Sequence, residues 1–210
     1  KLANKYGADS ITIHLREDRR HINDSDVIKI CKEKKIKVNL EISLNEKILK
    51  IAIRNKPNYV CLVPENRNEI TTEGGLDLIK NYKKLKKTIH KLKKNNIRTS
   101  LFIDPILKNI MIAKDLNSEC VKLHTGKLSN LIKKKKSYIN EFNRIKECSQ
   151  LASNLDLEVH AGHGMDYKTT KILNKIQYIK EFNIGHFVIG ESIFEGFKKV
   201  IMKFKKLSNN

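Results

Sequence analysis

The sequence contains no tryptophan, and aromatic residues make up only 6% of the chain. None of them alternates with the basic runs, as side chains that stack on nucleic-acid bases do. No apolar run approaches the roughly 18 residues of a membrane span. The N-terminal segment KLANKYGADS also has no apolar stretch like that of a secretory signal. The sequence therefore predicts a cytoplasmic protein with no membrane or nucleic-acid partner.

Cysteine is scarce, and its four residues include no CxxC pair. Cys61 and Cys120 lie within apolar runs typical of strands, so we expect buried free thiols in a reducing compartment. His160 and His163 form an HxGH pair, but no cysteine or carboxylate stands beside them at a ligand-like spacing. An acid/base histidine at a glycine-rich strand end is favoured over a zinc site.

The charge balance is strongly basic, with 43 lysines and arginines against 23 acids and a net charge of +20. Such an excess is typical of nucleic-acid-binding proteins. Only seven of the 43 are arginine, however, and lysine, asparagine and isoleucine share codons rich in A and T. Genomic base bias therefore explains the excess, and the lysine clusters at 83–94 and 133–136 are predicted to be solvated helix faces. Nucleic-acid binding stays as an alternative that a steep salt dependence would support.

Short runs typical of strands alternate with segments of helical periodicity along the chain. The predicted strands are 11–15, 37–41, 59–63, 99–103, 120–124, 157–161 and 186–190. The predicted helices are 24–35, 44–55, 76–95, 106–117, 131–154 and 167–182. The alternation predicts one α/β domain over 1–210, with a parallel sheet and right-handed crossovers.

Seven strands is one fewer than a closed (β/α)8 barrel requires, and such a barrel typically needs about 250 residues. The chain opens with KLANKYGAD, which is typical of a helix end and a loop that leads into a strand. This pattern indicates that an upstream strand is missing. An open doubly wound sheet is the competing architecture.

Polar residues and glycines follow the carboxyl end of nearly every predicted strand. Examples are HLREDRRH at 14–21, NLE at 39–41, HTG at 124–126 and HAGHG at 160–164. Each polar residue taken alone has an ordinary explanation: His14 could be a core histidine, and Glu41 could pair with a neighbouring lysine. Their repetition at one edge of a parallel sheet favours an active site there.

Glycines near the last two predicted strands suit phosphate held by backbone N–H groups. These glycines are Gly162, Gly164, Gly185 and Gly190. Arginines in HLREDRRH are suited to clamp a second anionic group. The residues alone therefore predict an acid/base enzyme that acts on phosphorylated small molecules.

Taken together, these segments resemble the pyridoxine 5′-phosphate synthase family. The matching motifs are GADSITIHLREDRRHI, VNLE, CLVPE, EITTEGGLD, SLFIDP, LHTG, VHAGHG and NIGHFVIG, in order from Gly7 to Gly190. The resemblance implies a (β/α)8 TIM-type barrel, here with seven of eight strands, assembled as a homo-octamer. It implies condensation of 1-deoxy-D-xylulose 5-phosphate with 3-amino-2-oxopropyl phosphate, a transferase reaction of vitamin B6 biosynthesis that needs no cofactor.

The resemblance also implies roles for particular residues. His14 and Glu41 would be general bases, and His163 would be the general acid, since an imidazole titrates near neutral pH. Residues Arg16, His21 and Thr71 would hold the deoxyxylulose phosphate. Backbone groups of Gly164, Gly185 and His186 would hold the phosphate of the amino ketone. A loop carrying TTEGG, after the third predicted strand, would close over the substrates.

The sequence departs from the family pattern in two places. The family begins with a strand of the type GVNIDH and an arginine-bearing loop, and this sequence starts after them. The family also carries a glutamate two residues before the histidine of HTG, where this chain has Lys122. Both departures favour an alternative hypothesis, a non-catalytic barrel remnant that binds phosphate or sister subunits. The presence of His14, Glu41 and His163 opposes it.

Overall fold

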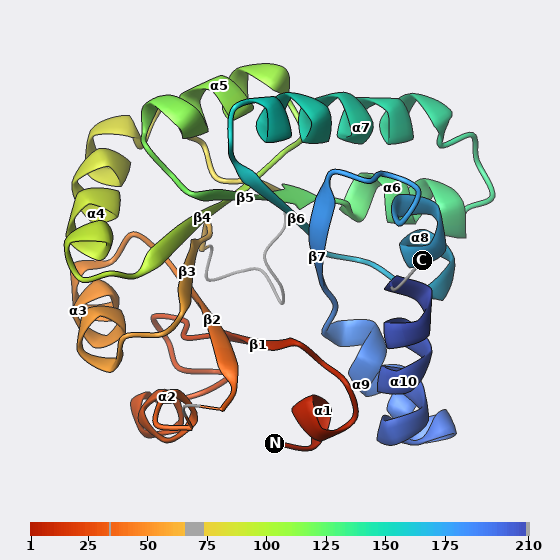
Figure 1. Cartoon of the computed structure of the whole chain (residues 1–210), viewed down its shortest axis with the longest axis horizontal. Helices are drawn as coiled ribbons and strands as arrows, with labels where there is room; N and C mark the ends of the chain where they lie inside the picture. Colours follow the sequence, from red (N-terminus) through yellow and green to blue (C-terminus); the bar gives the residue numbers. More distant parts are fainter. Residues whose placement is uncertain (34, 66–73, 209–210) are drawn as a thin grey trace.

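The computed structural model describes residues 1–33, 35–65 and 74–208. Seven parallel strands form one sheet, and their order in the sheet is their order in the chain. They are β1 (Ser10–His14), β2 (Lys37–Ile42), β3 (Tyr59–Leu62), β4 (Arg98–Ile103), β5 (Cys120–His124), β6 (Glu158–Gly162) and β7 (Ile179–Asn183). The strands curl around a common centre with the helices outside them (Figure 1). This arrangement confirms the TIM-type barrel with seven strands and rules out the doubly wound sheet, whose strand order reverses.

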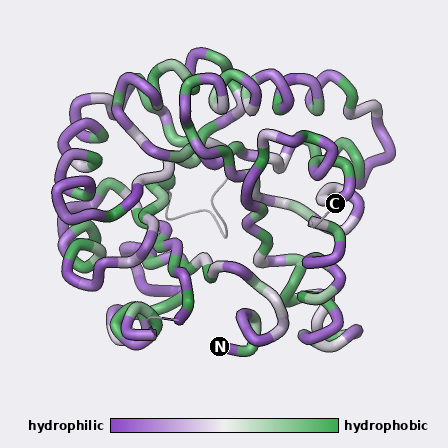
Figure 2. Tube along the Cα trace, viewed as in Figure 1, coloured by the Kyte–Doolittle hydropathy of each residue, from purple (hydrophilic) through white to green (hydrophobic). Residues whose placement is uncertain are grey.

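The helices surround the sheet and bury their apolar faces against it. They are α1 (Leu2–Lys5), α2 (Asp24–Cys31), α3 (Glu46–Asn55), α4 (Tyr82–Lys94), α5 (Leu107–Asp115), α6 (Gly126–Lys133), α7 (Ile139–Asn154), α8 (Tyr167–Leu173), α9 (His186–Glu195) and α10 (Phe197–Ser208). Helix α4 buries Leu85, Ile89 and Leu92 and leaves its lysines exposed. The predicted solvated lysine face at 83–94 is thereby confirmed. The cluster at 133–136 is exposed as predicted, but only Lys133 lies on a helix, because α6 ends there. Figure 2 shows hydrophilic residues along the outer helices. Within the described ranges, no helix has the length and apolarity to cross a membrane.

The predicted last strand, 186–190, is wrong. His186 to Gly190 begin helix α9, and the seventh strand is Ile179–Asn183, which starts inside the segment predicted as helix 167–182 and ends one residue beyond it. The sequence HFVIG is a short apolar run, and periodicity alone cannot tell a strand from a buried helical segment at that length. The true strand, IKEFN, is only partly buried and places Glu181 and Asn183 beside His160 and Gly162 of β6, so it lacks the apolar run of a central strand. The predicted helix 131–154 is also in fact parts of two helices, α6 and α7.

The two faces of the sheet differ sharply in polarity. One face pairs Leu40 with Val60, and Leu62 with Leu101, in a core that continues into the helices. The opposite face lines the barrel interior, with Glu41 beside Cys61 and Cys61 beside Ser100. Barrel interiors are usually filled by layers of branched apolar side chains. This interior instead carries buried ionisable groups, which fold stability alone does not require.

The sheet ends at β1 and β7, and within the described residues no ladder joins these two strands. Every residue of β1 is partly exposed, whereas the central strands are mostly buried. Helices α1, α9 and α10 lie near the gap between them in Figure 1. The chain ends meet there, since Lys205 Nζ lies 2.7 Å from Asp9 Oδ1 and the Tyr6 and Phe197 rings lie 6.4 Å apart.

Candidate active site

Ionisable side chains converge at the carboxyl ends of the strands, as the sequence predicts. The parallel register places His14 at the end of β1 directly beside Glu41 of β2. Glu65 follows β3, Asp104 follows β4, His124 ends β5 and His163 follows β6. Since the strands are parallel, six segments far apart in the sequence deliver these groups to one edge of the barrel.

Glu41 is the centre of this cluster. Its Oε1 accepts a hydrogen bond of 2.5 Å from Lys122 Nζ, which reaches it across the interior from β5. Its Oε2 lies 3.9 Å from His14 Nδ1. Burial by itself would raise the pKa of the Glu41 carboxyl, but the charges of Lys122 and His14 and the Lys122 hydrogen bond outweigh it. The pKa therefore lies below its usual value, and the carboxylate is ionised at neutral pH.

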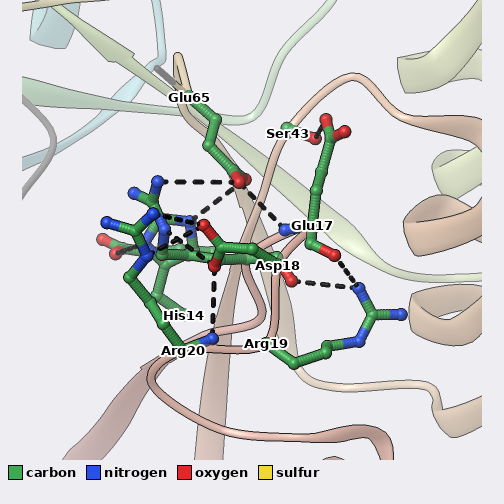
Figure 3. A network of polar contacts seen from close by, with 9 residues as sticks. His14, Glu17, Asp18, Arg19, Arg20, Ser43 and Glu65 are labelled. Atoms are coloured by element: carbon green, nitrogen blue, oxygen red, sulfur yellow. Dashed lines mark hydrogen bonds and ion pairs between the residues drawn. The ribbon is translucent and has the colours of Figure 1, made fainter. Parts of the chain in front are cut away.

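Arg16 lies beside this cluster and is completely buried. Its Nη2 is 3.8 Å from Glu65 Oε1, and its Nε is 3.4 Å from Asp18 Oδ1. The Glu65 side chain is only 4% exposed, and its Oε1 also accepts the Glu17 backbone N–H at 2.9 Å. Figure 3 shows this carboxylate facing the loop that follows β1. The loop after β1 therefore folds against the mouth of the barrel with Arg16 buried, while Glu17, Asp18 and Arg20 stay exposed.

His163 sits in a tight turn after β6, with a backbone φ of 82° that is uncommon for a residue other than glycine. Buried Thr125 holds this turn, because its hydroxyl lies 2.8 Å from the carbonyl oxygens of both Gly162 and His163. The His163 ring lies 4.8 Å from the ring of His124, whose Nδ1 is 3.2 Å from Asp104 Oδ1. Strained backbone of this kind is held where surrounding contacts determine it, often at functional sites.

Both predicted acid/base histidines are neutral at pH 7. Burial lowers the pKa of His14 to about 4; Glu41 opposes this, and His21, Arg16 and Lys122 add to it. Burial also lowers the pKa of His163 to about 4, with help from His124 and Lys122. His14 is therefore ready to accept a proton. The expectation that His163 titrates near neutrality is wrong for the free site, since its charged form is poorly solvated there.

The low pKa of His14 predicts a loss of stability in acid. The unfolded imidazole binds a proton below pH 6.5, whereas the folded one stays neutral down to about pH 4. The stabilising contribution is thus present above pH 6.5 and lost as the pH falls to 4, a total of about 3 kcal/mol. In urea titrations at several pH values, His14→Gln should flatten the fall in stability between pH 6.5 and 4. Replacing exposed His90 on α4 should leave that slope unchanged, and an equal slope in both variants would contradict the prediction.

The remaining predicted site residues that the structure describes occupy the same edge. The ring of exposed His21 lies 5.7 Å from that of His14, and the backbone of Gly164 adopts a φ of 72°. Gly185 is the N-cap of α9 and His186 its first residue. Because 186–190 is helical and not the predicted strand, the N–H groups of both residues lie at a helix N-terminus. Thr71, with most of the TTEGG segment, lies outside the described residues. Gly75, which is described, donates its N–H to Asp104 Oδ2 at 3.2 Å.

The sequence did not assign Lys122, Glu65, Asp104 or His124 to the site. Glu65, Asp104 and His124 lie at or just after strand ends, which was the available signal. Lys122 lies in the middle of β5, and the sequence marked it only as a departure from the family pattern. Among the described residues, no hydrogen-bond partner is found for the buried atoms His14 Nε2, His124 Nε2 and Glu65 Oε2. Buried polar atoms are nearly always paired, so such a group of them suits a bound polar ligand.

Three potential metal ligands, Cys120, Glu158 and His160, also gather in the barrel interior, with their ligand atoms within 4.8 Å of one another. The Arg98 guanidinium occupies their neighbourhood, with Nη2 2.9 Å from Glu158 Oε2 and 3.6 Å from Cys120 Sγ. Burial raises the pKa of the Cys120 thiol well above its usual value. A cation of the protein already neutralises this group, so it does not fit a metal ion. His160 is a buried histidine bound to Glu158 at 2.7 Å.

A parallel (β/α) barrel with an ionised carboxylate and neutral imidazoles at its carboxyl edge defines an acid/base barrel enzyme. The family model described as pyridoxal phosphate biosynthesis protein PdxJ matches residues 1–210. The chain belongs to this family of pyridoxine 5′-phosphate synthases, enzymes of vitamin B6 synthesis.

Relatives at high coverage carry the corresponding name. The chain is 65% identical to pyridoxine 5′-phosphate synthase of Pelagibacter ubique, over 98% of this chain and 86% of that protein. It is 46% identical to the Blochmanniella pennsylvanica synthase, over 98% of this chain and 84% of that protein. Among solved structures, a 3-hexulose-6-phosphate synthase matches with a TM-score of 0.66 at 11% identity, over 98% of this chain and 89% of that one. Such a distant structural likeness shows the barrel fold alone.

Proposed function

We propose that the chain condenses 1-deoxy-D-xylulose 5-phosphate with 3-amino-2-oxopropyl phosphate to give pyridoxine 5′-phosphate, inorganic phosphate and water. The observation that carries this proposal is the pairing of an ionised, buried Glu41 with a neutral His14 at 3.9 Å, at the strand ends of a family member. Both groups are in the protonation state that a general base needs at neutral pH.

In this proposal, His14 and Glu41 remove protons and His163 returns one. Schiff-base formation, phosphate elimination, ring closure and dehydration each move a proton, so several acid/base groups must act in turn. His163 needs a higher pKa than it has in the free site, and a bound phosphate dianion supplies the negative charge that raises it. Side chains thus supply every proton transfer, and the proposed reaction requires no metal or organic cofactor.

The proposed substrate contacts divide between two regions of the edge. Arg16, His21 and Thr71 hold the phosphate of the deoxyxylulose, and the planar guanidinium of an arginine suits a bidentate contact with phosphate. Backbone groups of Gly164, Gly185 and His186 hold the phosphate of the amino ketone. The start of α9 supports this assignment, because unpaired N–H groups and the helix dipole favour an anion there.

Purified chain incubated with both substrates tests the activity, with pyridoxine 5′-phosphate followed by its fluorescence. We expect product from the unaltered chain and none above background from His163→Ala. Omission of either substrate should also abolish the signal. No product from chain that circular dichroism shows to be folded would overturn the proposal and favour the non-catalytic remnant.

We also propose that residues 1–210 form one barrel domain, with a gap between β1 and β7 that a further strand would fill. The partly exposed edges of β1 and β7 support this proposal, since a strand between them would close the barrel. A peptide of the GVNIDH type added to the chain should raise its melting temperature, whereas a scrambled peptide should not.

We further propose that the chain assembles as a homo-octamer in the cytoplasm. Ile193 and Phe194 on α9 are 79% and 85% exposed, and large apolar side chains grouped in this way are typical of protein interfaces. The four cysteines are free thiols, which suits a reducing compartment. Sedimentation at several concentrations measures the assembly, and a monomer throughout would contradict it.

A further inference from the structure

Lys122 is a buried lysine in the interior of the barrel, with only 7% of its surface exposed. Its Nζ donates a 2.5 Å hydrogen bond to Glu41 Oε1 and lies 5.0 Å from the centre of the Phe102 ring. A lysine loses its hydration on burial, and the loss is offset only where a counter-charge lies close. Glu41 supplies that charge directly.

The neighbouring strand leaves room for this lysine. A Cβ atom at Gly162 would lie 2.7 Å from Lys122 Cε, closer than packed atoms allow. Gly162 is the register partner of His124 and ends β6, beside the strand that carries Lys122. The glycine before His163 therefore lets the lysine stem pass to Glu41, and the ion pair is built into the packing rather than placed on a free surface.

The charges around the pair favour its ionised form. Glu41 on β2 faces Lys122 on β5, His14 on β1 and His163 after β6. Lys122 also faces Cys61 on β3 and Glu181 on β7. Burial by itself would lower the pKa of Lys122, but Glu41 outweighs it, so the ammonium stays charged. A charged ammonium is not a nucleophile, which leaves an electrostatic and orienting role.

We propose that Lys122 is a positioning residue for Glu41, holding the carboxylate ionised and occupying Oε1 so that Oε2 is left facing His14 and the substrate. The proposal rests on the role of Glu41 as a base. Under this proposal the replacement of the family glutamate by Lys122 has a function, because the positive charge of Lys122 is paired with the Glu41 carboxylate of the site. Without the ammonium, burial would favour the protonated carboxyl group, which cannot accept a proton.

The test compares Lys122→Met and Lys122→Arg with the unaltered chain in the pyridoxine 5′-phosphate assay between pH 5 and 9. Methionine keeps the length of the side chain and removes its charge. We expect kcat of Lys122→Met to fall by up to about tenfold in acid, below the shifted limb where the Glu41 carboxyl is protonated, and to change less at pH 7. Its acid limb of kcat/KM should move up by at least about one pH unit, because an opposite charge at this distance shifts a carboxyl pKa by that much. KM for both substrates should change little, and Lys122→Arg should keep the acid limb near its original pH.

A matched control is the exposed pair in which Lys91 Nζ lies 2.7 Å from Glu46 Oε1, on α4 and α3. Lys91→Met should change neither kcat nor the pH profile. If Lys122→Met does not fold, the double variant Glu41→Gln, Lys122→Met tests the pairing by stability, since removing both charges should restore the melting temperature. An acid limb that stays in place in Lys122→Met, or a double variant no more stable than the single one, would overturn the proposal. If Glu41→Gln alone keeps full activity, the base assignment fails instead.

Discussion

Replacing Glu41 by glutamine is expected to lower kcat by about 10²- to 10⁴-fold, the usual contribution of a positioned acid/base group. Glutamine has nearly the same shape and still accepts the Lys122 hydrogen bond, but it cannot take up a proton. Because Glu41 lies 3.9 Å from His14 and is ionised, its loss should act on the chemical step rather than on substrate affinity. Steady-state kinetics with both substrates measures kcat and KM separately.

Stability has to be controlled in this experiment. Glu41→Gln leaves Lys122 buried without a counter-charge, which destabilises the fold. The double variant with Lys122→Met removes that charge, so it should regain the melting temperature while staying inactive. Activity restored in the double variant would show that the loss arose from misfolding and would contradict the assignment of Glu41 as a base.

Replacing Arg16 by methionine is expected to cost about 3–5 kcal/mol of folding free energy at pH 7, the usual cost of removing one partner of a buried ion pair. Arg16 is completely buried, and the Glu65 carboxylate it faces is 4% exposed. Burial already raises the pKa of Glu65, so without Arg16 the carboxylate is left charged in a poorly solvated place. Urea denaturation at pH 7 measures the change.

Two further measurements separate this mechanism from a simple loss of packing. Arg19→Met removes a partly exposed ion pair of 2.6 Å to Asp24 and two hydrogen bonds to the carbonyl oxygens of Arg16 and Glu17, and it should cost about 1–2 kcal/mol. The cost of Arg16→Met should also shrink as the pH falls, because protonation of Glu65 removes the unpaired charge. A cost equal to that of Arg19→Met, or one that grows in acid, would contradict the buried-pair explanation.

The order of the elements was readable from the sequence because strands and helices differ in apolar period. Six of the seven strands lie within a few residues of their predicted bounds. The seventh was missed because IKEFN is polar and HFVIG is apolar, and both are too short for the period to decide. An edge strand that faces a charged interior does not carry the apolar signal of a central strand.

The catalytic candidates His14, Glu41 and His163 were also readable, since polar residues interrupt apolar runs at strand ends and match distinctive motifs. The sequence by itself thus determined the family and the barrel, and it predicted the edge at which the proposed site lies. Only the tertiary structure decided the partners and the charge states. Lys122 meets Glu41 across 81 positions of chain because the curled sheet brings β2 and β5 to face each other across one interior. His14 and His163 are neutral because burial removes the water that would solvate their charge, and burial is a property of the folded chain alone.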